Sequence, residues 1–180
     1  MSAFTFITGN TGKAKYLSDY FHLPIEHKKL DLDEIQSLDL TKIVEDKVER
    51  AYKIVQKPVL VEDISLVFTS LDKLPGPLIK WFFETLGNEG LCRLLDGYSS
   101  REAVAEVQFA LHDGKEVKIF SGVMEGTISE HPRGEAGFGW DSVFIPHGHT
   151  KTWGEMSDDE KHNTSMRRIA LEKLNKHLNR

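Results

Sequence analysis

The spacing of apolar residues predicts that strands and helices alternate along the chain. Short apolar runs bounded by proline, glycine or acidic residues are typical of strands, whereas apolar residues at helical spacing are typical of amphipathic helices. The strand candidates are residues 4–8, 25–30, 58–68, 103–112, 116–128 and 143–145. The helix candidates are residues 11–22, 40–55, 79–87, 89–96 and 157–178.

Two of the longer strand candidates are joined by Asp113-Gly114, a dipeptide typical of tight hairpin turns. A capping box formed by Ser157 and Glu160 marks the start of the C-terminal helix. Together with the alternating strands and helices, the hairpin predicts an α/β fold with a mixed sheet. A chain of 180 residues is long enough for one full core, so we expect a single domain over residues 1–180.

The composition narrows the classes of function. The net charge of −5 and the lack of a basic run argue against a general nucleic-acid or membrane-surface binder. No uninterrupted apolar run approaches membrane-spanning length, and we recognise no signal peptide. Cys92 is the single cysteine, so no internal disulfide can form, and we expect a cytoplasmic protein.

The most informative segment is the loop Thr8–Lys13 (TGNTGK), which follows the first strand and opens the first helix. Glycines let the backbone approach a ligand closely, and the N-terminus of a helix directs free N–H groups at an anion. Lys13 places a positive charge in the first helical turn, where the helix dipole favours a negative one. A phosphate bound there would explain this placement. A glycine-rich turn with a solvated lysine is an equally good interpretation of the loop alone.

Glu62 and Asp63 interrupt an otherwise apolar strand. Neighbouring strand residues face opposite sides, so both cannot point away from a covered sheet. A buried carboxylate is costly unless it is paired or binds a metal. Together with Glu34 in an acidic loop, these residues offer the oxygen ligands that Mg²⁺ takes alongside substrate phosphates. The alternative is a strand end that emerges into solvent.

The segment Phe138-Gly139-Trp140-Asp141 places two aromatic rings around a glycine and beside a carboxylate. Such rings can stack on a flat base, which contributes about 1–3 kcal/mol per base. Two core aromatic residues that flank a turn are the alternative interpretation.

Four basic residues are candidates for contacts with phosphate or base. They are Lys47, Lys80, Lys161 and Arg167. The guanidinium group of arginine suits a carbonyl or phosphate acceptor, because it presents a fixed fork of donors. Taken one at a time, each of the four is more simply a solvated surface residue. The pair His147 and His149 receives no metal-binding role, since no third soft ligand lies near it in the sequence.

Taken in order along the chain, these segments resemble the inosine triphosphate pyrophosphatase family, whose members remove deaminated purine nucleotides. The resemblance covers nearly the whole chain, and no single motif carries it alone. The matching segments are Thr8-Gly9-Asn10 with Lys13, Pro58–Asp63, Leu74–Pro77 with Lys80, Phe138–Asp141, and Glu155-Met156 with Lys161 and Ser165–Arg167.

The resemblance implies an elongated mixed central sheet with helices forming two lobes around an active-site cleft, usually in a homodimer. It also implies a hydrolase that converts a nucleoside triphosphate to a monophosphate and pyrophosphate and depends on Mg²⁺. The expected partners are therefore the nucleoside triphosphate substrate and a second copy of the chain. As the composition indicates, we expect no nucleic-acid partner and no membrane.

Residue by residue, the resemblance implies three groups of site residues. The residues expected to bind the triphosphate are Thr8, Asn10, Lys13, Lys47 and Lys80. Glu34 and Asp63 are expected to hold the metal, and Asp63, with Glu62 beside it, is expected to orient or deprotonate the attacking water. The residues expected to form the base pocket are Phe138, Gly139, Trp140, Asp141, Lys161 and Arg167.

One position departs from the family pattern. The family ordinarily has a histidine between the serine and arginine of a Ser-His-Arg element, and this chain has Met166 there. Methionine cannot donate a strong hydrogen bond, and losing a neutral hydrogen bond costs about 0.5–1.5 kcal/mol. We therefore expect activity to persist, with weaker selectivity for 6-oxo purines over the standard purines.

Two alternatives to a pyrophosphatase of inosine and xanthosine triphosphates stay open. One is a pyrophosphatase with another base preference, and the other is a nucleotide-binding module that has lost turnover. Intact Glu34, Glu62 and Asp63 argue against the second alternative, because a pure binder gains little from burying acids. A fourth interpretation, a nucleic-acid-binding domain, is disfavoured by the negative net charge.

Overall fold

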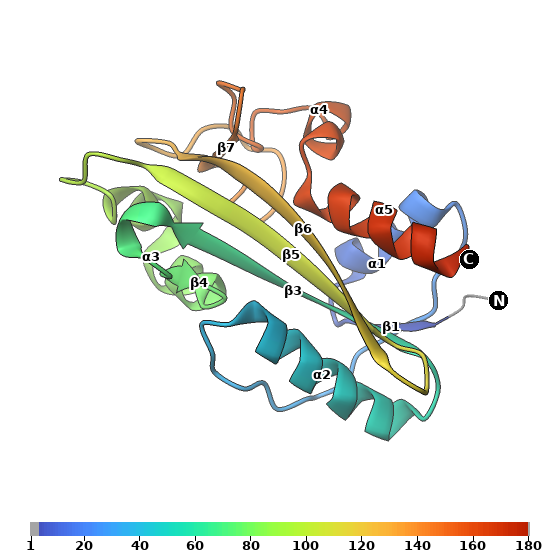
Figure 1. The fold of residues 1–180 in the computed structure, drawn as a ribbon. Coiled ribbons are helices and arrows are strands. Elements are labelled where there is room, and N and C mark those ends of the chain that lie inside the picture. Colours follow the sequence, from blue (N-terminus) through green and yellow to red (C-terminus); the bar gives the residue numbers. More distant parts are fainter. Residues whose placement is uncertain (1–3, 180) are drawn as a thin grey trace. The chain divides into compact units, whose positions relative to one another are not determined.

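The computed structural model describes residues 4–179, and these form a seven-stranded mixed sheet with helices (Figure 1). The strand order is β2-β1-β3-β5-β6-β7, and β4 pairs with β3 beside this path. The strands are β1 (Thr5–Ile7), β2 (His27–Lys28), β3 (Val59–Phe68), β4 (Pro75–Gly76), β5 (Glu102–His112), β6 (Val117–Ile128) and β7 (Phe144–Pro146). The α-helices are α1 (Thr11–Phe21), α2 (Leu40–Val55), α3 (Ile79–Arg93), α4 (Asp158–Asn163) and α5 (Met166–Leu178). The predicted mixed α/β fold is confirmed.

The chain divides into two compact units, which we describe separately. The first unit contains the described residues up to Asp63, residues 108–121 and the residues from Leu171 onward. The second unit contains residues 64–107 and 122–170. The chain passes from one unit to the other within β3, β5, β6 and α5.

The first unit is built around β1, which pairs in parallel with β2 on one side and with β3 on the other. Figure 1 shows α2 on one face of these strands and α1 on the other face. The buried residues that join α2 to the sheet are Ile7, Val44, Val48, Ala51, Val59, Val61 and Ala110. The apolar stripe that predicted an amphipathic helix over residues 40–55 is therefore the face of α2 that covers the sheet.

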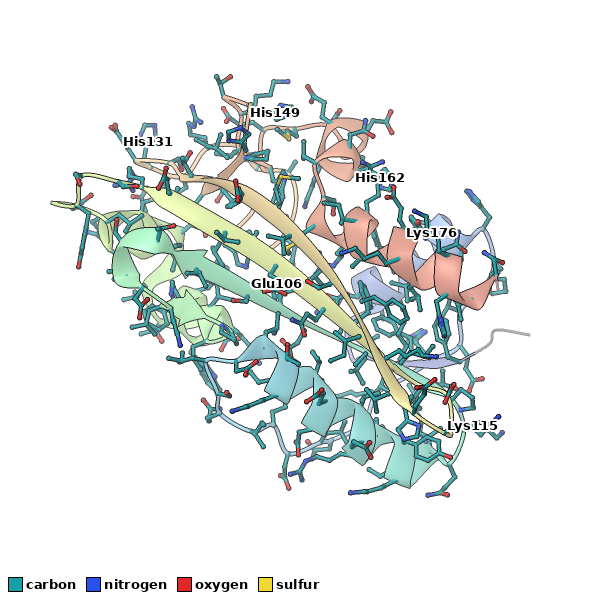
Figure 2. All side chains as sticks on the ribbon, viewed as in Figure 1. Glu106, Lys115, His131, His149, His162 and Lys176 are labelled. Carbon is teal, nitrogen blue, oxygen red and sulfur yellow. The ribbon has the colours of Figure 1, made fainter. Side chains whose placement is uncertain are left out.

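The hairpin between β5 and β6 belongs to the same unit, and Figure 2 shows Lys115 at its tip. Asp113 shapes the turn, since its Oδ1 accepts hydrogen bonds from the backbone N–H groups of Lys115 and Glu116. Gly114 adopts a positive φ of 101°, which a residue with a side chain rarely adopts. The hairpin predicted from Asp113-Gly114 is confirmed.

The second unit adds antiparallel partners to the long strands. β4 pairs antiparallel with β3, and β7 pairs antiparallel with β6. Arg101 ties this unit together, because its guanidinium group donates hydrogen bonds to the backbone carbonyls of Cys92, Ile128 and Ser129. Within the described residues, none of the helices combines the length and the apolar character that crossing a membrane requires.

The prediction of one continuous helix over residues 157–178 is wrong, because two helices occupy that stretch. The first helix starts at the predicted capping box of Ser157 and ends before Thr164. The hydroxyl group of Thr164 accepts a hydrogen bond from Trp153 Nε1. Ser165 Oγ then accepts from the backbone N–H of Arg167 and so caps the second helix. Two side-chain hydrogen bonds therefore break the helix at residues 164–165.

Of two smaller predictions, one agrees with the structure and one differs. The segments 79–87 and 89–96 were expected as separate helices, and α3 does consist of two helical segments that meet at a kink at Gly87, where φ is 64° and ψ is −179°. Pro75-Gly76, expected as part of a turn, forms the short strand β4. Both features arise at glycine and proline, which relax or fix the backbone angles that sequence spacing alone leaves open.

Candidate functional site

The loop that follows β1 lies at a point where the chain connections diverge to opposite faces of the sheet. From β1 the chain runs through α1 to β2 on one side, and it reaches β3 on the other side through α2. Ligands of parallel α/β sheets bind at the carboxyl ends of the strands, where the strand order reverses in this way. The segment Thr8–Lys13 occupies this position in the first unit.

Side chains within the loop fix its shape. Thr8 Oγ1 accepts a hydrogen bond from the backbone N–H of Asn10 at 3.0 Å, and Asn10 Oδ1 accepts from the backbone N–H of Lys13 at 3.2 Å. Asn10 is therefore the N-cap residue of α1. The first turn of α1 contains no acidic residue, so the positive end of the helix dipole keeps its attraction for an external anion.

Glu62 and Lys13 form an ion pair beside this loop. The distance between Lys13 Nζ and Glu62 Oε1 is 3.0 Å, and the Glu62 side chain is only 1% exposed. In the register of β1 and β3, Phe6 lies opposite Leu60, so Glu62 comes just past the last residue of β1. The alternative of a strand end in solvent is wrong, because β3 continues to Phe68.

Lys47 of α2 lies between Glu34 and Asp63, the two predicted metal ligands. Its Nζ is 2.7 Å from Glu34 Oε1 and 3.1 Å from Asp63 Oδ2. Burial by itself lowers the pKa of Lys47, but the nearby Asp63 and Glu34 carboxylates outweigh it, and the pKa is raised. Lys47 is therefore a charged ammonium group at neutral pH, held by two carboxylates.

A pocket of about 180 Å³ lies in the first unit, and most of these groups line it, though not Asp63. Lys13, Glu34, Lys47 and Glu62 all line it, together with Thr8 and Gly9. The other lining residues are Phe6, Ile7, Leu30, Asp31 and Leu32. Asp31 was not predicted as a site residue. Its position in the acidic loop, three residues before Glu34, is the signal that could have identified it.

The carboxylates suit a divalent cation of the magnesium type. Glu34 and Asp63 each place one oxygen within about 3 Å of a single cationic group, the Lys47 ammonium. Within the described residues, no group of three or more His, Cys, Asp and Glu side chains is arranged to hold a metal. Mg²⁺ commonly takes only one or two carboxylates and completes its shell with water and substrate phosphates, so the donor set fits.

In the second unit, Phe138 and Trp140 lie in different environments. Phe138 is 78% exposed, so its ring is free to stack on a planar ligand. Trp140 is 7% exposed and packs against Phe144 and Trp153, with ring centroids 5.9 and 5.6 Å apart. The alternative of a core aromatic residue therefore describes Trp140 and not Phe138.

Asp141 organises the turn that carries these rings. Its Oδ2 accepts hydrogen bonds from the backbone N–H of Phe138 and from Lys161 Nζ. Gly137, with a φ of 90°, passes so close to Asp141 that an added Cβ would overlap the carboxylate. Three predicted residues, Phe138, Asp141 and Lys161, are thus brought together.

The carbonyl of Gly139 accepts a hydrogen bond from Asn88 Nδ2 of α3 at 3.0 Å, and this residue was not predicted. In the sequence, its only distinguishing feature is the glycine before it, Gly87, where the helix is kinked in the structure.

The other predicted residues of the second unit are placed as follows. Lys80 lies at the start of α3, 4.0 Å from Glu84 and 5.6 Å from the centre of the Trp81 ring. Arg167 lies half-buried in the first turn of α5. A larger pocket of about 350 Å³ opens on β5, β6 and β7, and none of the predicted site residues lines it.

The model of the Ham1 family matches residues 4–177 of the chain. The chain belongs to the Ham1 family. Within this family it is 46% identical to inosine triphosphate pyrophosphatase 2 of Trypanosoma cruzi, over 97% of the chain and 91% of the relative. It is 44% identical to inosine triphosphate pyrophosphatase of Yarrowia lipolytica, over 94% of the chain and 92% of the relative.

Solved Ham1 structures share the fold. The HAM1 protein of Coxiella burnetii superimposes with a TM-score of 0.88 at 25% identity, over 98% of both chains. The Ham1 protein of Staphylococcus aureus gives a TM-score of 0.85 at 25% identity, over 98% of the chain and 97% of that structure. The Ham1 fold therefore extends over almost the whole chain.

Proposed function

We propose that this Ham1 protein hydrolyses inosine and xanthosine triphosphates, as ribo- or deoxyribonucleotides, to the monophosphate and pyrophosphate. The reaction would clear deaminated purines from the nucleotide pool. The observation that carries the proposal is the first-unit pocket beside the N-terminus of α1. It is lined by two lysines and by the carboxylates of Asp31, Glu34 and Glu62, and one of the lysines, Lys47, also pairs with Asp63. The names of the relatives with 44–46% identity support the same reaction.

The pocket offers the triphosphate two kinds of positive partner. The backbone N–H groups at the start of α1 and the Lys13 ammonium would bind the same phosphate group, because Lys13 belongs to the first turn of α1 and lines the pocket. Lys47 adds a second ammonium from α2. Negative charge accumulates on the departing pyrophosphate as the bond between the α- and β-phosphates breaks, so both lysines favour the transition state. Thr8 and Asn10 would hold the loop and contact the phosphates.

Asp63 is the proposed base for the attacking water, with Glu62 beside it. The Asp63 side chain is 23% exposed, whereas that of Glu62 is 1% exposed, so water reaches Asp63 more easily. A carboxylate within hydrogen-bond reach of water can orient it and accept its proton. A Mg²⁺ ion held by Glu34 and Asp63 would supply charge neutralisation for the phosphates.

For the base, the proposed contacts are in the second unit. The exposed ring of Phe138 would stack on the purine. Lys161 and Arg167 carry only donors, which match the 6-oxo group of hypoxanthine and xanthine and oppose the 6-amino group of adenine. Guanine also has a 6-oxo group, so its rejection must rest on the 2-amino group and the shape of the pocket.

Further parts of the proposal concern the whole protein. We propose that it acts as one functional domain, works as a homodimer, resides in the cytoplasm and uses Mg²⁺ as its divalent ion. The single family match over both units supports one domain. The single cysteine, which allows no internal disulfide, supports a reducing compartment.

Pyrophosphate release separates the candidate functions. The purified chain is incubated with ITP, XTP, dITP, GTP or ATP, with Mg²⁺ or with a chelator. Faster release from ITP and XTP than from ATP, lost with the chelator, is the expected result. Release that favours another nucleotide would support the alternative of an altered base preference that Met166 raises. Nucleotide binding without any pyrophosphate release would leave only a binding module.

A further inference from the structure

Lys47 lies between the two carboxylates that would hold a metal ion, those of Glu34 and Asp63. Its Nζ is within hydrogen-bond distance of one oxygen of Glu34 and one oxygen of Asp63. The Lys47 side chain is 18% exposed, and its neighbours Val44 and Val48 on α2 are fully buried against the sheet. The packing of α2 therefore fixes the backbone of Lys47, while its long side chain can move, and Glu34 comes from the irregular segment before α2.

We propose that Lys47 is an exchangeable internal cation: it occupies the Glu34–Asp63 carboxylates until a divalent ion replaces it, and the displaced ammonium then binds the substrate phosphates. The proposal rests on the proposed function, since it assumes that these two acids are the metal ligands. It adds that the metal competes with Lys47 for the two carboxylates, and that the triphosphate accepts the displaced ammonium group.

The distances around Lys47 favour the exchange. A magnesium ion lies about 2.0–2.1 Å from its oxygen ligands. An ammonium group 2.7 and 3.1 Å from the same two oxygens would then lie next to a divalent cation of the same sign. Such repulsion is strong for a group that is mostly buried. The ammonium therefore leaves the carboxylates when the metal arrives.

The destination of the displaced ammonium is set by the same pocket. Lys47 lines the first-unit pocket with Thr8, Gly9 and Lys13, the residues of the anion-binding loop. With a phosphate in that pocket, the ammonium exchanges two carboxylates for phosphate oxygens. Without a phosphate, the metal must displace the ammonium group, which then gains no new partner. The metal should therefore bind weakly to the protein alone and more tightly when substrate is present. By linkage, the substrate should also bind more tightly when the metal is present.

Lys13 provides an internal contrast. It pairs with Glu62, which is not one of the two proposed metal ligands. Removal of Lys13 would therefore leave Glu34 and Asp63 still occupied by Lys47. Among residues 4–179, only Lys47 combines contact with both proposed ligands and a position on the first-unit pocket.

The test measures Mg²⁺ binding to the full chain by titration calorimetry without nucleotide. Lys47→Gln removes the internal cation, and we expect the Kd for Mg²⁺ to fall by about five-fold or more, within the usual range of coupling between sites. Lys42→Gln is the matched control, because Lys42 is an exposed lysine of the same helix and its loss changes the net charge equally. It should leave the Kd unchanged.

Two further variants keep the outcome decisive. Lys47→Arg retains the positive charge, so its Kd should stay at the wild-type value or rise. Glu34→Gln should weaken Mg²⁺ binding in every background. Equal or weaker Mg²⁺ binding by a folded Lys47→Gln protein, as judged by circular dichroism, overturns the exchange.

The exchange and the proposed function can fail separately. If Glu34→Gln binds Mg²⁺ as wild type does, the metal site is elsewhere and the exchange is wrong for that reason. The pyrophosphate assay, which needs no assumption about Lys47, reports on the proposed function by itself.

Discussion

Glu62 and Asp63 are consecutive residues of β3, yet they pair with lysines from two different helices. Glu62 Oε1 is 3.0 Å from Lys13 Nζ of α1, and Asp63 Oδ2 is 3.1 Å from Lys47 Nζ of α2. Successive residues of a strand face opposite sides, and Figure 1 shows these helices on opposite faces of the sheet. One strand thus supplies one carboxylate to each helix, which gives the two acids different surroundings and different expected roles.

The first prediction concerns Asp63. Asp63→Asn keeps the size of the side chain but removes its charge and its ability to accept a proton, so kcat should fall by about 10²-fold or more. Nucleotide affinity should change little, because the lysines and the loop remain. Steady-state pyrophosphate release gives kcat, and titration with a non-hydrolysable triphosphate gives the affinity.

A matched control accompanies this variant. Glu45→Gln removes a carboxylate from an exposed position on α2 and should leave kcat unchanged. Near-normal turnover by Asp63→Asn, together with a large loss in Glu62→Gln, would transfer the role of the base to Glu62.

The second prediction concerns Lys13. Lys13→Ala should lower kcat/KM for ITP, GTP and ATP by the same factor, because the ammonium meets phosphate and not the purine. The substitution also removes the cation paired with the buried Glu62, so the free energy of unfolding should fall by about 1–3 kcal/mol. Adding Glu62→Gln should restore part of this stability, as measured by denaturant unfolding. A loss of activity that differs between bases would contradict the role of Lys13.

Much of the fold could be predicted from local patterns, and long-range pairings could not. The helix α2 matches its predicted bounds because its apolar stripe, its N-cap Asp39 and its end at Gln56 are local signals. The pairing of Lys47 with Asp63 depends on α2 packing against the sheet beside β3, which no spacing along the chain reveals. The sequence therefore led to the prediction of a phosphate contact for Lys47 without revealing its position between two acids.

The second unit shows the same limit. Phe138 and Trp140 are two residues apart and of similar chemistry, and only the packing of Phe144 and Trp153 around Trp140 distinguishes them. The break at Thr164 depends on a hydrogen bond from Trp153, eleven residues earlier in the chain. Motifs indicate which residue types gather, whereas tertiary contacts decide which side chain faces a ligand.

The third prediction uses this difference in burial. Phe138→Ala should raise KM through the loss of stacking, equivalent to about 1–3 kcal/mol, with little change in Tm because the ring is exposed. Trp140→Ala should instead lower the free energy of unfolding by about 3–5 kcal/mol, because it empties a buried aromatic cluster. Parallel thermal melts and kinetics check both. A large drop in Tm with unchanged KM in Phe138→Ala would exclude Phe138 from base binding.

The fourth prediction concerns pH and Glu160 of the capping box. Hydrogen bonds from Lys151 and from the backbone of Ser157 lower the pKa of Glu160 from 4.5 to about 2. A lowered folded-state pKa stabilises the protein above the unfolded-state pKa, and this stability is lost as the pH falls toward the folded-state pKa. The Tm difference between wild type and Glu160→Gln should therefore be constant above about pH 4.5 and shrink between pH 4.5 and 2. A difference that does not depend on pH would contradict the ionic contribution.

The fifth prediction concerns Met166, the first residue of α5, which is 3% exposed and precedes Arg167. If the missing hydrogen-bond donor weakens selectivity, Met166→His should raise the ratio of kcat/KM for ITP over ATP by about two- to ten-fold, which corresponds to 0.5–1.5 kcal/mol. Met166→Leu is the control, because it conserves volume and adds no donor, and it should leave the ratio unchanged. Thermal melts show whether the buried histidine costs stability. Identical ratios in the histidine and leucine variants would mean that Met166 does not set the base preference.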